Sequence, residues 1–223
     1  MKTTFLKSII KSLPILAALF FWSYITMAAN PEEDFRIMKQ KNGIDLFYRW
    51  MVMAEGNKVR QMKAVFEVNG STDQVISLLK DEQQALAWIP SAQEYRNLEP
   101  ATGPAWVSYI KFSAPWPLAD QDCILEYTAT TAVDGATVIE FACNPDYLPP
   151  VDGVTRMKDI NGTFVVHSSQ GGKSLVECYF LSKKASVIPR WITDPIISGS
   201  IISLMEGMRD QLSDVEYSQI LQK

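Results

Sequence analysis

The sequence has few of the residues from which metal and catalytic sites are usually built. It contains one histidine, His167, and three cysteines, and neither a C-x-x-C nor an H-E-x-x-H pattern occurs. Structural zinc sites draw on several such ligands at short spacings, so the composition argues against zinc. We therefore expect no metal ion, no cofactor and no catalytic residue, and a protein that binds or carries a ligand.

Three cysteines cannot all pair within one chain. Cys123, Cys143 and Cys178 each lie in an apolar run that resembles a strand. Free cysteine is among the most frequently buried residue types. The sequence therefore predicts buried thiols with a structural role.

Basic residues are scarce once residues 1–29 are set aside. The chain has 21 Lys and Arg against 25 Asp and Glu, a formal charge of −4. Lys2, Lys7 and Lys11 belong to the first 29 residues, which have no acidic residue, so residues 30–223 carry 18 basic against 25 acidic side chains, or −7. Binding to a phosphate backbone needs a basic surface. We expect no nucleic-acid partner.

Residues 1–29 have the features of an export segment. The three lysines precede a long apolar stretch, residues 13–27, and the small residues Ala28 and Ala29 suit cleavage by a signal peptidase. The alternative, an uncleaved membrane anchor, stays open because about 17 residues just span a bilayer. The short segment is typical of bacteria, and it predicts a periplasmic or secreted protein whose residues 30–223 form a single domain, which we expect to be a monomer.

In the rest of the chain, apolar and polar residues alternate as in β-strands, and the last segment has the spacing of a helix. Asn30 and Pro31 followed by two glutamates suggest a first helix, and Ser71 suggests the cap of a short helix, with another helical piece reaching Trp88. The helical spacing after Pro189 predicts a long C-terminal helix. Alternation of apolar and polar residues predicts strands at 44–53, 59–68, 106–112, 123–131, 137–143, 154–168 and 174–181. This order indicates an α+β fold in which one antiparallel sheet curls around one helix.

Charged residues within the strands show which positions face inward. Lys111, Glu126, Glu140 and Glu177 are expected to face water, so their neighbours at odd offsets face the interior. The inward set is aliphatic and aromatic, without a cluster of carboxylates. A packed core accounts for such a set as well as a ligand cavity does, and both interpretations stay open at this point.

Four segments of the chain form recognisable motifs in a fixed order. They are a helix that ends in tryptophan before an acidic strand, a proline-containing turn, a Gly-Val-x-Arg strand opening, and an Ile-Pro-x-Trp helix opening. They are found at 82–88 with Glu94-Tyr95 and Leu98-Glu99, at 115–122, at 153–156 and at 188–192. Together they resemble the START domains, the lipid-transfer modules related to the steroidogenic acute regulatory protein, and the resemblance runs from about Asp34 to the C-terminus.

This resemblance implies a helix-grip fold with an internal hydrophobic tunnel for one lipid. It also implies that the C-terminal helix and the loop 144–152 gate the tunnel, and that the protein meets membrane surfaces transiently. The implied tunnel lining combines inward strand residues with a stripe of the C-terminal helix. It comprises Ser108, Ile110, Phe112, Leu125, Tyr127, Ile139, Phe141, Phe164, Val166, Val176, Cys178, Phe180, Ile197, Ile201, Leu204 and Met208.

The sequence departs from the family pattern at two places. Gln121 occupies a turn position where the family usually has arginine, and the positions that match a buried acid–arginine pair of some sterol-binding members are Ser108 and Tyr127, both neutral. A charge-fixed sterol mode is therefore not supported. A related enzyme, a cyclase or hydrolase acting in the same cavity, is the alternative, although no inward acid, base and nucleophile stand together.

Asn161 and Gly162 distinguish local turn rules from the family pattern. Asn-Gly favours a type I′ hairpin turn, whereas the resemblance implies one strand that runs through both residues. We expect the strand, with Gly162 facing the tunnel and leaving room for ligand.

Overall fold

The computed structural model describes residues 34–54, 56–114, 119–182 and 190–213, all of which belong to one unit, Glu33–Lys223. Alternating apolar residues place strands, and a capping box at Ser71 and Gln74 starts the first helix. The elements in chain order are β1 (Arg36–Lys41), β2 (Ile44–Val52), β3 (Lys58–Val68), α1 (Thr72–Lys80), α2 (Ala85–Trp88), β4 (Ala92–Asn97), β5 (Ala105–Phe112), β6 (Gln121–Thr131), β7 (Thr137–Cys143), β8 (Thr155–Arg156), β9 (Ile160–Ser168), β10 (Ser174–Ser182) and α3 (Arg190–Ser213).

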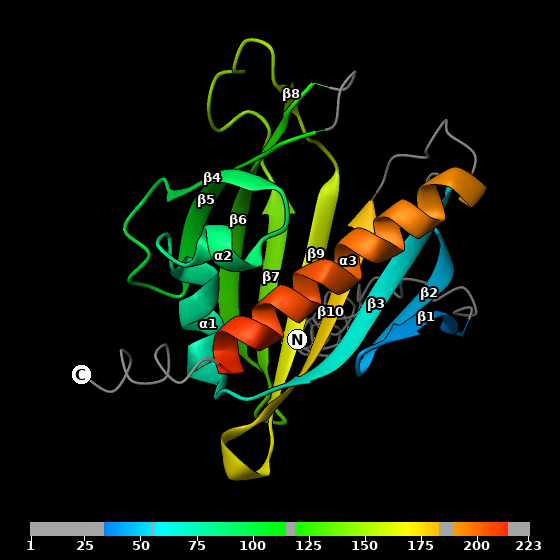
Figure 1. Ribbon diagram of the computed structural model, residues 1–223, viewed down its shortest axis with the longest axis vertical. Helices are drawn as coiled ribbons and strands as arrows, with labels where there is room; N and C mark the ends of the chain where they lie inside the picture. The colour runs from blue at the N-terminus through cyan, green and yellow to red at the C-terminus, as the bar shows by residue number, and fades with distance from the viewer. Residues whose placement is uncertain (1–33, 55, 115–118, 183–189, 214–223) are drawn as a thin grey trace, which may run out of the picture. The chain divides into compact units, whose positions relative to one another are not determined.

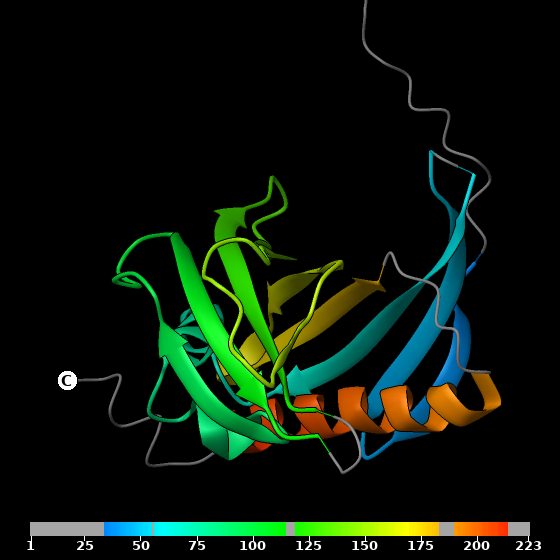
Figure 2. The same cartoon turned by 90° about the horizontal axis from the view of Figure 1, so that it is seen from above.

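The strands form one curved sheet with α3 lying across its concave face (Figure 1). The strand order is β1-β2-β3-β10-β9-β7-β6-β5-β4, with antiparallel pairing throughout this path, and β8 pairs in parallel with β6. Seen from above, the sheet bends around the helix (Figure 2). The predicted α+β helix-grip fold is confirmed.

The helix α3 packs against one end of this path and against the two small helices. It contacts β1, β2 and β3 on one side and α1 and α2 on the other. Its buried residues include Ile202, Met205 and Leu212 beside the expected Ile201 and Met208, so the buried stripe is wider than the predicted one. The main core lies between this stripe and the inward side chains of the sheet.

The first described element is a strand that the sequence analysis did not predict. The proposed helix start at Asn30 lies outside the described residues, and from Arg36 onward the chain is strand β1. Only two of its six residues are even partly buried, so β1 lacks the alternation by which strands are found in sequence. A local signal was present in Asn42 and Gly43, which adopt the positive φ values of 52° and 74° that an Asn-Gly hairpin turn requires.

The predicted strand 154–168 is interrupted. The chain forms the two-residue β8, leaves the sheet at Met157–Asp159 with a positive φ of 62° at Asp159, and re-enters as β9. The prediction that the strand runs through Asn161 and Gly162 is confirmed, because both residues pair with β7 and β10.

Candidate ligand-binding cavity

A cavity of about 520 Å³ lies between the sheet and the middle part of α3, from Ile196 to Leu204. Its walls come from β4, β5, β6, β7, β9 and β10 of the sheet, from α1 and the α2–β4 connection, and from α3. The strands contribute inward side chains at every second residue, and the curvature of the sheet separates its centre from the helix. A space of this size is within the range of pockets that hold one small molecule.

Nine of the sixteen residues predicted to line a tunnel do line this cavity. They share an inward position on the sheet, or lie on the middle part of α3 that covers the cavity. They are Ile110, Phe112, Leu125, Tyr127, Phe141, Phe164, Phe180, Ile201 and Leu204.

The other seven predicted residues lie outside the cavity lining. They face the correct side of the sheet or helix, but most of them belong to the packed core where α1 and the C-terminal half of α3 come down onto the strands. Val166, Val176 and Cys178 have no exposed surface, whereas Ile197 is only half-buried. The seven are Ser108, Ile139, Val166, Val176, Cys178, Ile197 and Met208.

The cavity has further lining residues that sequence reasoning did not include. Gln121 and Cys123 share the parity of Leu125 and Tyr127 on β6, so strand alternation could have found them. Apart from Tyr95 on β4 and Ile160 on β9, the remainder lie in connections and on helices, whose position over a sheet no local pattern gives. The whole remainder comprises Leu79, Trp88, Ile89, Pro90, Ser91, Tyr95, Ser113, Ala114, Met157, Ile160, Ile196 and Ser200.

The cavity opens to solvent beside α3. Ser91, Ser113 and Ser200 line it and are exposed, and Ile196 is 63% exposed. These residues come from the α2–β4 connection, the β5–β6 connection and the solvent-facing side of α3. The opening therefore lies where those three elements meet.

No charged side chain lines the cavity within the described chain. Its polar groups are hydroxyls, a thiol and one amide, and burial raises the pKa of the Cys123 thiol. No acid, base and nucleophile stand together there, and no three potential metal ligands of the described residues gather at any point.

Two buried hydroxyls serve the protein itself. Ser108 donates to the Asn97 side-chain oxygen at 2.8 Å, and the Tyr95 hydroxyl donates to the carbonyl of Leu79 at 2.6 Å, while the two hydroxyls lie 2.9 Å apart. Both hydroxyl hydrogens are used within this network. Burial raises the pKa of Tyr95 to about 12.

Tyr127 occupies the inner part of the cavity. Its ring stacks on Trp106 with 4.7 Å between ring centroids and an interplanar angle of 2°, and it lies 5.9 Å from the ring of Phe141. Burial raises its pKa well above the usual value. Among the described residues its hydroxyl has no hydrogen-bond partner.

Gly162 faces inward as predicted, but the space beside it is filled by protein. A Cβ at this position would collide with the Phe141 ring and with the carbonyl oxygen of Tyr179. The glycine therefore makes room for Phe141, itself a lining residue, and the expectation that it makes room for ligand is wrong.

The loop 144–152 does not line this cavity. Tyr147 and Leu148 pack against Val107, Tyr109 and Ile124, whose side chains point to the outer face of the sheet. No residue of the loop lines the cavity. The resemblance implied a gate at this loop, and its packing on the outer face of the sheet gives that role no support.

Arg156 binds the loop 144–152 through backbone carbonyls. Its guanidinium forms two hydrogen bonds with the Asp122 carboxylate, at 2.7 and 3.0 Å, and donates to the carbonyls of Pro145, Leu148 and Pro149. The Arg156 and Asp122 side chains are 6% and 1% exposed. The Arg of the Gly-Val-x-Arg segment and the Asp that ends the proline-containing turn thus form one buried ion pair.

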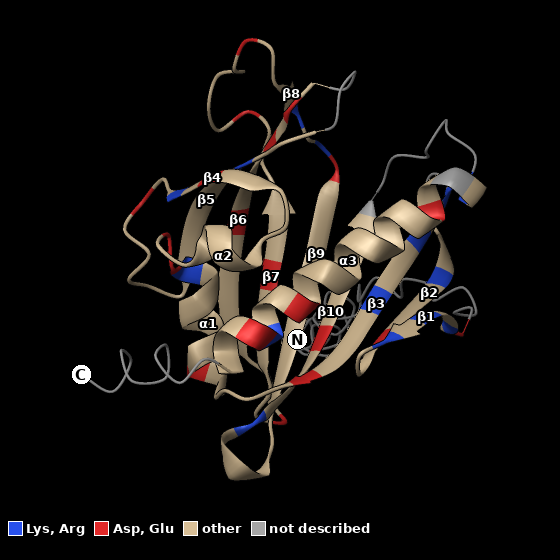
Figure 3. Cartoon of the chain, viewed as in Figure 1, with Lys and Arg blue, Asp and Glu red and all other residues tan. Residues whose placement is uncertain are grey.

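Polar contacts fix α3 at two places that flank an uncharged middle. Near its start, Arg60 of β3 donates to both oxygens of Asp194 at 2.7 and 2.8 Å, which lowers the pKa of that carboxyl. Further along, Glu206 accepts from Asn42 at 2.7 Å and pairs with Lys41 at 3.2 Å. The segment between these contacts carries no Lys, Arg, Asp or Glu and covers the cavity (Figure 3).

A curved antiparallel sheet that holds a C-terminal helix, with a cavity between them, defines the helix-grip class of α+β proteins. Within that class, the chain has the START-domain fold. A STAR-related lipid transfer protein from Xanthomonas axonopodis superimposes with a TM-score of 0.70 and 23% identity, over 81% of this chain and 99% of that one. The human StarD13 lipid transfer and protein localization domain gives a TM-score of 0.66 and 15% identity, over 82% and 91% of the two chains. Human STARD10 gives 0.65 and 16%, over 83% and 76%.

Sequence comparison alone is less informative. No protein-family model matches the chain. An uncharacterized protein of Pseudomonas aeruginosa, PA1579, is 21% identical over 177 residues, which are 79% of this chain and 86% of that protein.

Among the described helices, none combines the length and the apolar character needed to cross a bilayer.

Proposed function

We propose that this protein binds one lipid, or a similar hydrophobic molecule, in the cavity between the sheet and α3, and carries it between membranes. The observation that supports this most strongly is the cavity itself, which has about 520 Å³ of space and an uncharged lining of mainly apolar residues. The fold that the chain shares with proteins named for lipid transfer points the same way.

The energetics of such a site suit its lining. A lipid tail that loses about 500 Å² of apolar surface to water gains roughly 12 kcal/mol at about 25 cal/mol per Å². Association and ordering oppose much of this gain, which leaves an affinity between micromolar and nanomolar. Binding of this kind needs little polar recognition.

Binding accounts for the cavity better than catalysis does. A nucleophile such as Cys123 needs an adjacent base, and none lines the described cavity. Burial instead raises the pKa of the Cys123 thiol, which disfavours the reactive thiolate.

A pair of tryptophan substitutions on α3 tests the site. Leu204 lines the cavity, whereas the adjacent Ser203 is exposed on the same helix. Leu204→Trp should fill part of the cavity and reduce the lipid found by native mass spectrometry at least tenfold, and the matched control Ser203→Trp should leave it unchanged. Equal loading of both folded variants would place the lipid elsewhere.

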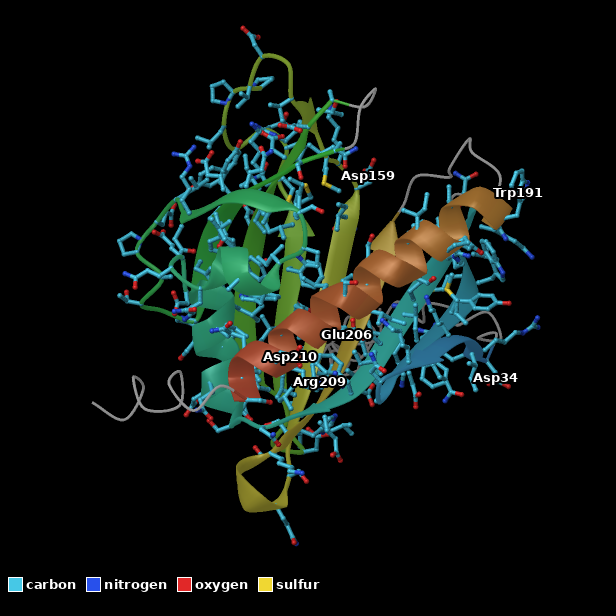
Figure 4. All side chains as sticks on the ribbon, viewed as in Figure 1. Asp34, Asp159, Trp191, Glu206, Arg209 and Asp210 are labelled. Atoms are coloured by element: carbon cyan, nitrogen blue, oxygen red, sulfur yellow. The ribbon has the colours of Figure 1, made fainter. Side chains whose placement is uncertain are left out.

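We further propose that the N-terminal half of α3 moves to admit the ligand at a membrane surface. It borders the opening and presents Trp191, 78% exposed, and Ile196, 63% exposed. In Figure 4 Trp191 projects from the end of the helix away from the sheet. Trp191→Ala should slow transfer from phosphatidylcholine vesicles, and Val133→Ala, at another exposed apolar position, should not.

Export of the protein remains our proposal from residues 1–29. The positive segment followed by an apolar run supports it. Mass spectrometry of the native protein should find an N-terminus at Ala29 or Asn30, and an intact Met1 would contradict cleavage.

A further inference from the structure

The ends of the cavity differ in their polar groups, and strand β6 shows how far apart they lie. Gln121, Cys123, Leu125 and Tyr127 line the cavity from successive inward positions of this strand. At about 3.3 Å per residue, Tyr127 lies about 20 Å along β6 from Gln121. Gln121 pairs with Phe112 next to the opening, whereas Tyr127 pairs with Trp106 and Phe141 at the inner end.

The inner end has one hydroxyl to offer to a ligand. Tyr127 is 6% exposed, and in the described chain its hydroxyl has no hydrogen-bond partner. Tyr95 and Ser108 nearby have committed their hydroxyl hydrogens to protein acceptors. The indole nitrogens of Trp88 and Trp106 also lack partners, but protein atoms enclose them completely.

The Tyr127 hydroxyl is not among the completely enclosed polar atoms of the described chain that lack a partner, so it reaches the cavity space. A bound molecule that displaces water from this point has to supply an oxygen for the hydrogen bond, because a hydroxyl buried without a partner costs free energy. The Tyr127 ring is held by its stacking on Trp106 and its contact with Phe141, so the hydroxyl is fixed before any ligand arrives. A donor that is already in place loses little entropy on binding.

Charge at the same point is disfavoured. The described lining holds no Lys, Arg or His that could pair with a carboxylate or phosphate, and no acid that could pair with an amine. An ionised group at the inner end would lose its hydration without compensation.

From these contacts we infer the ligand class: an uncharged lipid with a hydroxyl or carbonyl oxygen, such as a sterol, a fatty alcohol or an ester, which enters oxygen first and accepts a hydrogen bond from Tyr127. This inference rests on the proposed lipid-binding function and adds the chemistry and orientation of the ligand. A charged headgroup left at the opening, with its tail at Tyr127, is the competing arrangement.

Four probes with the same hydrocarbon chain separate these arrangements. Octadecane, octadecanol, methyl octadecanoate and octadecanoate at pH 9 would each displace Nile red from the delipidated full chain, and the displacement curves give their relative affinities. We expect octadecanol and the methyl ester to bind at least fivefold more tightly than octadecane, and octadecanoate to bind more weakly than octadecanol.

Tyr127→Phe removes the hydroxyl and leaves the ring. It should weaken octadecanol and methyl ester binding about fivefold, the effect of one neutral hydrogen bond, and leave octadecane unchanged. Tyr147→Phe removes a hydroxyl that donates to Glu99 on the exposed surface, and should change no affinity.

The outcomes separate this inference from the function on which it rests. If the folded wild type takes up neither dye nor any probe, lipid binding itself fails. If the probes bind but octadecanoate is preferred, or Tyr127→Phe binds all four like the wild type, the inferred ligand class is wrong and the lipid-binding proposal stands. Circular dichroism of both variants confirms that they are folded.

Discussion

A buried ion pair between two side chains fixes the position of a strand end and of a loop. Asp122 and Arg156 form a bidentate pair, and Arg156 also satisfies three carbonyls of the loop 144–152. A guanidinium has five donors, and here they join a strand, a short parallel pairing and a loop. The pair therefore acts as a structural centre for the end of the sheet where β6 and β8 meet.

The Asp122–Arg156 pair gives a first prediction. Asp122→Asn should lower the free energy of unfolding by about 3–5 kcal/mol, because it leaves the Arg156 charge buried without its partner. Denaturant unfolding measures the change. Glu94→Gln breaks the exposed pair with Arg96 and should cost no more than about 1 kcal/mol. If the two variants lose similar amounts of unfolding free energy, burial does not make the Asp122–Arg156 pair more important than an exposed pair.

At the scale of elements, α3 is fixed more firmly along its C-terminal half than at its start. The Glu206 contacts with Asn42 and Lys41 hold it to the β1–β2 turn, and Gly207 lets it approach the backbone of Trp88 in α2. Its first turns depend on the Arg60–Asp194 pair and on the stacking of Arg190 over Trp50 at 3.9 Å. The half beside the cavity opening is therefore the half more able to move.

Loss of the Arg60–Asp194 pair should ease that movement. Arg60→Gln should raise the rate of ligand exchange about fivefold, for a partly exposed pair that contributes about 1 kcal/mol. Lys41→Gln weakens the contact at the other half and should leave the rate unchanged. Stopped-flow transfer of a fluorescent lipid gives both rates, and equal rates in the two variants would argue against this opening.

The protonation of Asp194 decides at which pH the Arg60–Asp194 ion pair is formed. Arg60 lowers the pKa of Asp194 below its ordinary value of 3.8, so the carboxylate is charged in the folded state at any higher pH. The stability from the pair is present above pH 3.8 and is lost as pH falls through the lowered pKa. The pair therefore stays formed between pH 5 and 8, and stopped-flow measurements should find no change of the exchange rate with pH in that range that depends on Arg60.

At the scale of the whole molecule, folding buries the side chains of Tyr95 and Tyr127 in a largely apolar interior. Tyr95 and Tyr127 are 8% and 6% exposed, and burial raises the pKa of each. In the unfolded chain tyrosine ionises near pH 10. Between pH 10 and the raised values the folded state holds protons that the unfolded state has released.

The folded state should consequently lose stability in alkali. The free energy of unfolding should fall from pH 10 to 12 by roughly 1.4 kcal/mol per pH unit for each of these tyrosines. Tyr95→Phe should give a shallower fall, and urea unfolding at several pH values measures both slopes. Parallel slopes in the wild type and Tyr95→Phe would mean that Tyr95 keeps an ordinary pKa.

By itself the sequence determined most strands, the capped helix at Ser71, the long C-terminal helix and the inward face of the sheet, because those features follow from local periodicity and capping. The sequence did not determine which inward-facing residues line the cavity and which are packed in the core. Phe164 and Val166 are two residues apart on the same face of β9, yet Phe164 lines the cavity and Val166 is sealed in the core. Only the tertiary structure decided this, because the place where α3 and α1 meet the sheet separates an open space from a packed one, and contacts distant in sequence set that place.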